Sequence, residues 1–371
     1  LYAPMNESYL RELGADSVIG GEFEEGVTGV YRQVMAKGHD PFEQPLPTIS
    51  LRRQDFLVPD RAGLPGLDSY ARLQMSPNDA RITGYTEASR GCRHLCRHCP
   101  VVPVYNGRFV VVQPDVVLED VRRQVAAGAQ HITFGDPDFF NGPQHALRVV
   151  RQMHDEFPSL TYDVTIKVEH LRKHADLLPG LKATGCVLVT SAIESFDDEI
   201  LARFDKSHTY DDLEAVIDTL RDFDLALNPT FVTFTPWTTP DGYIDFLATL
   251  ARLNLVSAMS SVQYAIRLLV PANSKLLELD EVCDLVAPFD EVELAHPWKH
   301  PDPAVDRLFE DVVEAVQRCQ KAGLGHIETF NAVWDTAHAA RGVEAAPLVD
   351  PRTADVEPLA AIPYLTEPWY C

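Results

Sequence analysis

The sequence has few basic residues for its size. Among 371 residues, 32 lysines and arginines stand against 55 aspartates and glutamates, which gives a formal net charge of −23. A surface this acidic repels phosphate backbones, so we expect no nucleic acid partner. The sequence also lacks an apolar run of 18 or more residues and a signal-peptide pattern, so we expect no association with a membrane.

Cysteine is present but does not form the pattern of a disulfide framework. There are seven cysteines, an odd number in a long chain, and only one C-x-x-C pair. A composition of 46% hydrophobic and 23% charged residues instead indicates one large folded core. Unpaired cysteines are typical of a reducing compartment, so we expect the protein to be cytoplasmic.

Three of the cysteines lie close together, directly after a strand-like run at residues 82–88. Cys92, Cys96 and Cys99 have the spacing C-x-x-x-C-x-x-C. Thiolates are the usual protein ligands of iron–sulfur clusters. A cubane cluster has four irons, so three cysteines leave one iron open for chemistry. Two other interpretations remain: a zinc site completed by His94 or His98, and a set of buried core thiols.

On this motif the chain is identified as a member of the radical S-adenosylmethionine (SAM) superfamily. The resemblance implies a 4Fe–4S cluster whose open iron binds SAM. It also implies that an electron from the reduced cluster breaks a carbon–sulfur bond of SAM and leaves an organic radical. A small-molecule substrate and an electron donor such as flavodoxin or ferredoxin follow from the same resemblance. His98 stands where relatives commonly have an aromatic residue beside the adenine.

Strands and helices alternate from Ile82 onward, which predicts parallel βα units and an α/β fold. Pro114 predicts the start of one helix, and Thr209 with Asp212 predicts the capped start of another. Six units match the partial (β/α)6 barrel of TIM type that the resemblance implies. We expect its strands at residues 82–88, 131–134, 160–168, 187–193, 225–234 and 261–269.

Further regions flank the expected barrel. A short strand at Val18 and Ile19, followed by Gly20-Gly21-Glu22 and a helix to about Lys37, resembles the closing segment of a Rossmann-like cobalamin-binding domain. Because the chain begins with Leu1, we expect more sequence upstream. The predicted regions are a cobalamin-domain-like end (1–40), a proline-rich linker (41–80), the barrel (81–295), a helical extension (296–342) and an extended tail (343–371).

Two of the expected barrel strands alternate polar and apolar residues. In the third strand, Asp163 and Lys167 alternate with valine and isoleucine, and in the sixth Arg267 lies opposite apolar neighbours. Polar rows are unusual for a strand buried on both faces. We therefore predict contact of these three residues with substrate or SAM, and a buried ion-pair network remains the alternative.

The resemblance suggests further cofactor-binding positions. Gly135 and Asp136 follow the second strand, where relatives have a turn whose backbone receives the SAM amino group. Ser191 and Glu194 lie on the fourth strand, where a polar group commonly contacts SAM, and Lys206 could neutralise a carboxylate. A structural salt bridge is the alternative for Glu194 and Lys206.

The tail ends in Trp369-Tyr370-Cys371 after a proline-rich stretch. This ending resembles radical SAM proteins with a Cys-Cys or selenocysteine-containing tail followed by Ala-Glu-Pro. Those relatives include the enzyme that starts the biosynthesis of the organoarsenical antibiotic arsinothricin. Because soft thiolates favour soft acceptors, we predict that Cys371 acts on the substrate, and an incidental cysteine is the alternative.

The leading prediction is thus a radical SAM enzyme that modifies a small molecule, with arsenic as one candidate for a soft substrate. A cobalamin-dependent radical SAM methyltransferase is the second prediction, and whether cobalamin binds stays open. A non-catalytic iron–sulfur or zinc protein is the alternative from another class.

Overall fold

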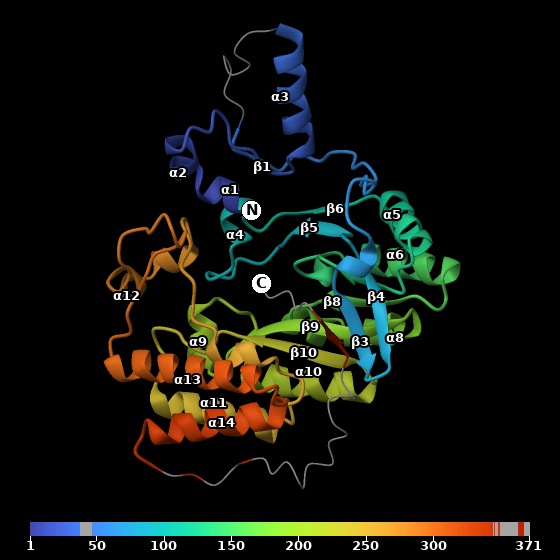
Figure 1. The fold of residues 1–371 in the computed structure, drawn as a ribbon. Coiled ribbons are helices and arrows are strands. Elements are labelled where there is room, and N and C mark those ends of the chain that lie inside the picture. Colours follow the sequence, from blue (N-terminus) through green and yellow to red (C-terminus); the bar gives the residue numbers. More distant parts are fainter. Residues whose placement is uncertain (38–46, 344, 346–347, 349–362, 367–371) are drawn as a thin grey trace. The chain divides into compact units, whose positions relative to one another are not determined.

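The computed structural model describes residues 1–37, 47–343, 345, 348 and 363–366 (Figure 1). Contacts divide the chain into two compact units. The first unit contains residues 1–57, 89–113 and 269–298, and the second contains residues 58–88, 114–268 and 299–371. Each unit is described by itself below.

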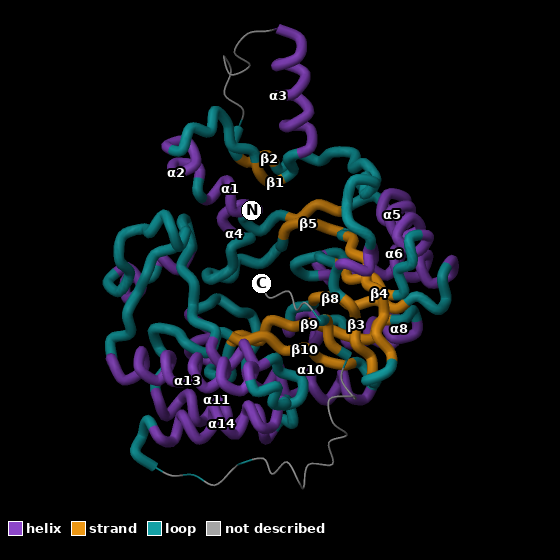
Figure 2. The backbone as a smooth tube through the Cα atoms, in the orientation of Figure 1, coloured by secondary structure: helices purple, strands orange, loops and turns teal. Residues whose placement is uncertain are grey.

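The second unit contains a seven-stranded sheet with the order β10-β9-β8-β7-β4-β3-β11 (Figures 1 and 2). Five neighbouring strands are parallel, and two further strands, β3 and β11, pair antiparallel at one edge. The α/β class and a barrel-like core are therefore confirmed. The parallel strands are β4 (Asp79–Thr86), β7 (His131–Phe134), β8 (Thr161–Thr165), β9 (Cys186–Glu194) and β10 (Ala226–Phe231), and the edge strands are β3 (Arg72–Ser76) and β11 (Tyr364–Leu365).

Helices follow the parallel strands, and local sequence determines where they begin. Several start with proline in the first turn, and Thr209 and Asp212 form the predicted capping box of α10. The helices of this unit are α5 (Pro114–Ala126), α6 (Pro143–Glu156), α7 (Val168–Lys173), α8 (Leu178–Ala183), α9 (Asp198–Arg203), α10 (Tyr210–Asp222), α11 (Pro240–Arg252), α13 (Pro303–Lys321) and α14 (His326–Ala339).

The two faces of the sheet differ in polarity. The outer face, defined here as the face on which Tyr162 contacts α8, is covered by helices: the Tyr162 hydroxyl lies 3.2 Å from the Leu181 carbonyl oxygen. On this face Ile132, Val164 and Val189 are almost completely buried. The inner face, defined as the opposite one, carries the alternate residues of each strand, which are polar and only half-buried in several places.

The prediction of a sixth parallel strand at residues 261–269 was wrong. Residues Ser261–Ala265 form a 3₁₀ helix, and only Arg267 makes an isolated bridge, to Phe234. The side chain of Gln263 occupies the strand edge instead, because its amide oxygen accepts a hydrogen bond of 2.8 Å from the Phe231 backbone. The alternation at residues 261–269 therefore does not correspond to a strand.

Two other expectations about strands also need correction. The third strand ends at Thr165 rather than Val168, because Lys167 is already the N-cap residue of α7. In the proline-rich region predicted as a linker, residues 72–76 form β3, which pairs with β4 across a tight turn.

The first unit is built from short elements around the cysteine motif. Val18 and Ile19 lie outside any strand, and the neighbouring Gly20 and Gly21 pair in parallel with residues 49–50. A complete Rossmann-like domain is not seen in the described part of this unit. Its elements are α1 (Tyr2–Met5), α2 (Glu7–Glu12), β1 (Gly20–Gly21), α3 (Glu24–Lys37), β2 (Ile49–Ser50), β5 (Ser89–Gly91), α4 (Val102–Tyr105), β6 (Phe109–Val111) and α12 (Asp280–Cys283).

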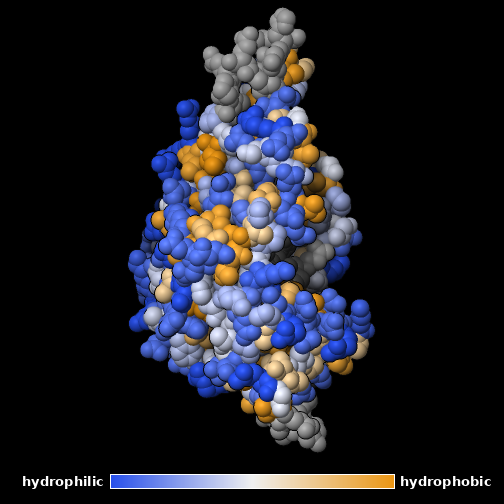
Figure 3. Space-filling view, turned by 90° about the vertical axis from the view of Figure 1, so that its left-hand side faces the viewer, coloured by the Kyte–Doolittle hydropathy of each residue, from blue (hydrophilic) through white to orange (hydrophobic). Residues whose placement is uncertain are grey.

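The surface reflects the charged composition of the chain. In the view of Figure 3, hydrophobic residues form separate small groups among mainly hydrophilic ones. Among the described residues, no helix is both long and apolar enough to cross a membrane.

Candidate functional site

The three clustered cysteines lie in one loop of the first unit, the cysteine loop (residues 92–101). Antiparallel pairing of β5 with β6 closes this segment of the chain, with Gly91 opposite Phe109. Cys96 is buried, whereas Cys92 and Cys99 are half-buried. A turn brings the Cys99 backbone nitrogen to 3.2 Å from the Cys96 carbonyl oxygen. Three thiols on so short a loop are a donor set that suits one metal cluster.

The cysteine loop packs on an apolar cluster that includes the beginning of the chain. Cys92 and Cys99 pack against a cluster of buried residues that includes Met5, Val104 and Tyr105. Asn273 also donates a hydrogen bond of 3.3 Å to the Met5 carbonyl oxygen. The N-terminal segment and the cysteine motif therefore share one small core.

The inner face of the second unit carries a row of polar side chains from neighbouring strands. Thr165, Thr190 and Asn228 occupy the same register position on β8, β9 and β10. All three are half-buried, and the Asn228 amide donates a hydrogen bond of 3.1 Å to the Thr190 hydroxyl. Alternation in the third strand predicts this face for Asp163, and the sequence analysis did not identify Thr190 or Asn228 as part of it.

Asp163 lies on the inner face inside a hydrogen-bonded network. Its Oδ1 atom accepts a hydrogen bond of 2.6 Å from the Thr133 hydroxyl and lies 2.9 Å from Nε2 of His131. The other ring nitrogen of His131 lies 2.8 Å from the Thr161 hydroxyl. Asp163 and His131 are buried, so this geometry fits the alternative of a satisfied buried network.

Polar residues gather at the carboxyl ends of β8 and β9. Lys206, Glu194 and Lys167 were predicted from the sequence, and His208 was not. The Lys206 ammonium group lies 3.2 Å from the Glu194 carboxylate and donates a hydrogen bond of 2.7 Å to the Ala192 carbonyl oxygen. Glu194 has a φ of 71°, so the backbone turns sharply at this position. Lys167 is also buried and lies 3.5 Å from Glu169.

His208 is a buried residue of this region that the sequence analysis missed. Burial, and then Lys206 and Lys167, lower the pKa of His208 to about 3, against smaller opposing effects of Glu194 and the Ile193 backbone. Neither ring nitrogen has a hydrogen-bond partner of normal geometry within the described residues. The imidazole is thus neutral near pH 7. His208 directly precedes Thr209, the N-cap residue of α10, and this position gives no sequence signal for such burial.

The loop after β7 contains Gly135 and Asp136. A Cβ atom on Gly135 would lie 1.8 Å from the Tyr85 hydroxyl oxygen and 2.2 Å from its ring, so the Tyr85 side chain would have to shift to admit any other residue here. The Asp136 carboxylate accepts a hydrogen bond of 2.8 Å from the Ala88 backbone, and His145 lies 3.1 Å from the Ala88 carbonyl oxygen. Both backbone groups of Ala88 are therefore held at the point where the chain leaves β4.

Four further residues were predicted from the sequence to belong to the site. Ser191 follows inner-face Thr190 and so lies on the outer face, away from the polar row. Arg267 lies 2.9 Å from the Asp306 carboxylate and stacks on Phe309, which ties it to α13. His98 is half-buried beside Cys99. Cys371 lies outside the described residues.

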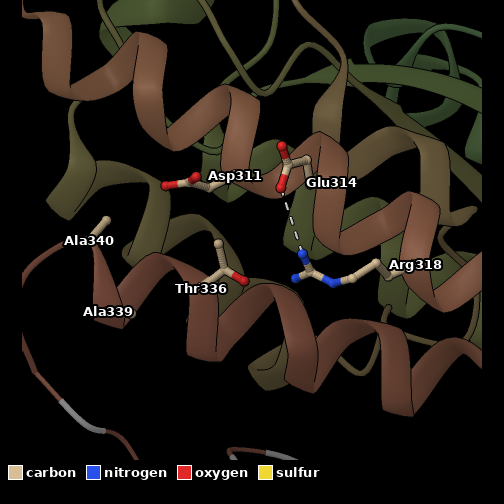
Figure 4. A pocket seen from close by; sticks show the side chains of 6 residues that line it. All are labelled: Asp311, Glu314, Arg318, Thr336, Ala339 and Ala340. Atoms are coloured by element: carbon tan, nitrogen blue, oxygen red, sulfur yellow. Dashed lines mark ion pairs between the residues drawn. The ribbon is translucent and has the colours of Figure 1, made fainter.

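A shallow hollow of about 310 Å³ lies between α13 and α14 (Figure 4). An ion pair of 3.7 Å between Arg318 and Glu314, one turn apart on α13, lies along one wall of it. None of the predicted site residues lines this hollow, so we do not associate it with the chemistry of the cysteines.

Comparison with known proteins agrees with this geometry. Residues 86–240 match the family model described as the radical SAM superfamily. A curated relative, tRNA-2-methylthio-N(6)-dimethylallyladenosine synthase of Desulfosudis oleivorans, is 26% identical over 227 residues, which are 58% of this chain and 47% of that protein. The chain thus spans about half the length of this relative.

Two solved structures have a similar fold. The cobalamin-dependent SAM radical enzyme OxsB, with aqua-cobalamin bound, has a TM-score of 0.55 at 13% identity, over 64% of this chain and 41% of that one. The radical SAM methyltransferase TsrM from Kitasatospora setae, with tryptophan and a SAM analogue bound, has a TM-score of 0.56 at 17% identity, over 76% and 57% of the two chains. These structures share the fold of this chain, and residues 86–240 match the radical SAM superfamily by sequence.

Proposed function

We propose that Cys92, Cys96 and Cys99 hold a 4Fe–4S cluster whose fourth iron binds SAM, and that the enzyme modifies a small-molecule substrate. The observation that carries this proposal is the set of three cysteines on one loop, inside the span that matches the superfamily. When bound, such a cluster supplies the electron that breaks a carbon–sulfur bond of SAM. The radical chemistry belongs to the cofactors, and the protein binds, orients and excludes water.

The chain's own residues suit these supporting roles. Gly135 lets Tyr85 lie directly on the backbone after β7, and Asp136 fixes the end of β4 through Ala88. Near the carboxyl ends of β8 and β9, Lys206 and Lys167 are buried cations that lie beside Glu194 and Glu169. Buried ammonium groups favour an anionic ligand group, and the carboxylate of SAM or of a substrate has the required charge.

The cluster is tested by anaerobic reconstitution with iron and sulfide. We expect close to four irons per chain in the wild type, and a cluster spectrum that SAM perturbs. Replacing any one of Cys92, Cys96 or Cys99 with serine should abolish this signal, because no other thiol lies on the loop. Cys283→Ser is the matched control, since Cys283 is an exposed free thiol elsewhere. Stoichiometric zinc in place of iron would refute the proposal.

A small molecule is favoured over tRNA as the substrate. The curated relative is named for a tRNA modification, but this chain carries a net charge of −23, which opposes binding to a polyanion. Filter binding with bulk tRNA at low salt distinguishes the two, and saturable binding in the micromolar range would favour tRNA. A soft, arsenic-type substrate held by tail thiols remains part of the proposal, together with a one-electron donor such as flavodoxin or ferredoxin.

A cobalamin-dependent methyltransferase is the second candidate function. It is favoured by the fold shared with OxsB, whose structure contains cobalamin. Desalting after incubation with hydroxocobalamin decides between the candidates. Retention of one corrin per chain, with methyl transfer that depends on it, would support the methyltransferase. Loss of all corrin absorbance would support cobalamin-independent chemistry.

A further inference from the structure

A buried carboxylate lies against both ends of the cysteine loop. Glu22 is only 2% exposed. One of its carboxylate oxygens accepts a hydrogen bond of 3.1 Å from the Tyr105 hydroxyl, and the other lies 3.5 Å from the Arg90 guanidinium. Arg90 precedes the first cysteine by two residues, and Tyr105 follows the last by six. Glu22 thus joins the chain before the loop to the chain after it.

Arg90 is itself held firmly. Its guanidinium pairs with Glu24 as well as with Glu22. Aromatic rings also lie near it, with ring centres 5.7 Å away for Phe23 and 4.9 Å away for Phe56. Cation–π contacts of this kind add to the ion pairs when the guanidinium is partly desolvated. The position of Arg90 is therefore determined by several groups of the N-terminal segment.

Tyr105 continues the connection to the cysteines. A Cβ atom on Gly91 would lie 2.3 Å from the Tyr105 ring, so this ring fills the space beside the backbone directly before Cys92. The same tyrosine belongs to the apolar cluster on which Cys92 and Cys99 pack. A shift of the Tyr105 ring would therefore move two of the three thiols.

Burying a carboxylate at this place has a free-energy cost. Burial raises the pKa of Glu22, and the Arg90 charge and the Tyr105 hydrogen bond oppose that increase. Replacing a whole buried ion pair by neutral residues is often neutral or stabilising for the fold, whereas removing one partner destabilises it. Two carboxylates with one guanidinium also leave excess negative charge next to the loop, and nearby charge is one of the factors that set the potential of an iron–sulfur cluster.

We propose that Glu22 is a positioning residue for the iron–sulfur cluster, which bridges Arg90 and Tyr105 to fix the cysteine loop and adds negative charge beside it. The proposal rests on the proposed function, since it needs the cluster on Cys92, Cys96 and Cys99. It gives the Gly20-Gly21-Glu22 turn a role in this chain that does not depend on cobalamin.

The test compares Glu22→Gln with Glu25→Gln, which removes the same charge from an exposed position in the next turn. Both variants are reconstituted anaerobically as full chains. The midpoint potential is measured by a redox titration followed by electron paramagnetic resonance, and the rate of iron loss is measured with a chelator. We expect Glu22→Gln to shift the potential to a less negative value and to lose iron several-fold faster, and Glu25→Gln to match the wild type.

Tyr105→Phe keeps the proposal testable if Glu22→Gln fails to fold. It removes only the phenol hydroxyl, so the charge stays and the bridge is lost. For Tyr105→Phe we expect faster iron loss with little change in potential. Glu22→Asp keeps the negative charge, so its potential should lie between those of Glu22→Gln and the wild type. Wild-type potential and iron-loss rate in both Glu22→Gln and Tyr105→Phe would overturn the proposal. A wild-type chain that takes up no iron would instead refute the proposed function.

Discussion

The Asp163 carboxylate and the His131 imidazole are joined at 2.9 Å on the inner face of the sheet, between neighbouring strands β8 and β7. Because the same carboxylate oxygen also accepts the Thr133 hydroxyl, Asp163→Ala leaves two donors without their acceptor. Each buried donor that loses its acceptor lowers the stability of the fold by roughly 1–3 kcal/mol. We expect the free energy of unfolding, measured with denaturant, to fall by a comparable amount.

Asp163→Asn separates this structural role from a catalytic one. Asparagine keeps an acceptor oxygen, so the variant should remain folded and keep its iron. Thr133→Val is the control for the loss of a single hydrogen bond. If Asp163→Asn retains wild-type stability but loses substrate turnover, Asp163 is catalytic and the network interpretation fails.

Gly135→Ala is expected to be poorly tolerated because of Tyr85. The added methyl group would overlap the Tyr85 ring, and overpacking of this kind costs about 1–3 kcal/mol. Tyr85→Ala in the same chain should recover most of that loss, since it removes the atoms that clash. Thermal unfolding of the two single variants and the double variant measures the coupling. Additive effects would show that the contact is unimportant.

His208 predicts a specific loss of stability in acid. Its pKa in the folded chain, about 3, is below the ordinary value of 6.5, so the unfolded chain binds the proton more readily. The stabilisation is complete above about pH 6.5 and is lost as the pH falls toward 3. At about pH 5 the free energy of unfolding has fallen by ~2 kcal/mol from its value at neutral pH. His208→Gln should flatten this dependence in denaturant titrations, and an unchanged slope would contradict the buried neutral imidazole.

The tail cysteine gives a prediction about turnover. β11 pairs antiparallel with β3, which pairs antiparallel with β4, so the tail runs in the direction of β4 at this point. Cys371 lies five positions after Thr366, a distance that about 17 Å of extended chain can span. We expect Cys371→Ala to keep iron content and SAM binding but to lose substrate turnover and affinity for trivalent arsenicals. Loss of iron would instead make Cys371 a ligand.

Elements with strong local signals were predicted well from sequence. Pro114 begins α5, residues 131–134 form β7, and the Thr209 capping box begins α10, because each depends on residues within a few positions. The 3₁₀ helix at residues 261–265 was mistaken for a strand, since its alternation reflects packing by Gln263 against β10. Short-range pattern does not reveal such long-range contacts.

For the candidate site, the cysteine spacing was enough to predict the family. Sequence could not reveal the contact of Glu22 with Tyr105 or the burial of His208, because both depend on residues far apart in the chain. The proline-rich region hid β3 for a related reason, since β3 is stabilised by β4 and β11 and not by its own composition.

The pairing of β11 with β3 has a consequence for the synthesis of the protein. Arg72 and Thr366, which exchange two hydrogen bonds, are 294 residues apart. At a translation rate of about 5–20 residues per second, this edge of the sheet waits roughly 15–60 s for its partner. An unpaired strand edge can pair with other chains during that interval. The edge of the nascent sheet at β3 is therefore open to aggregation until β11 has been made, and slower translation would prolong that risk.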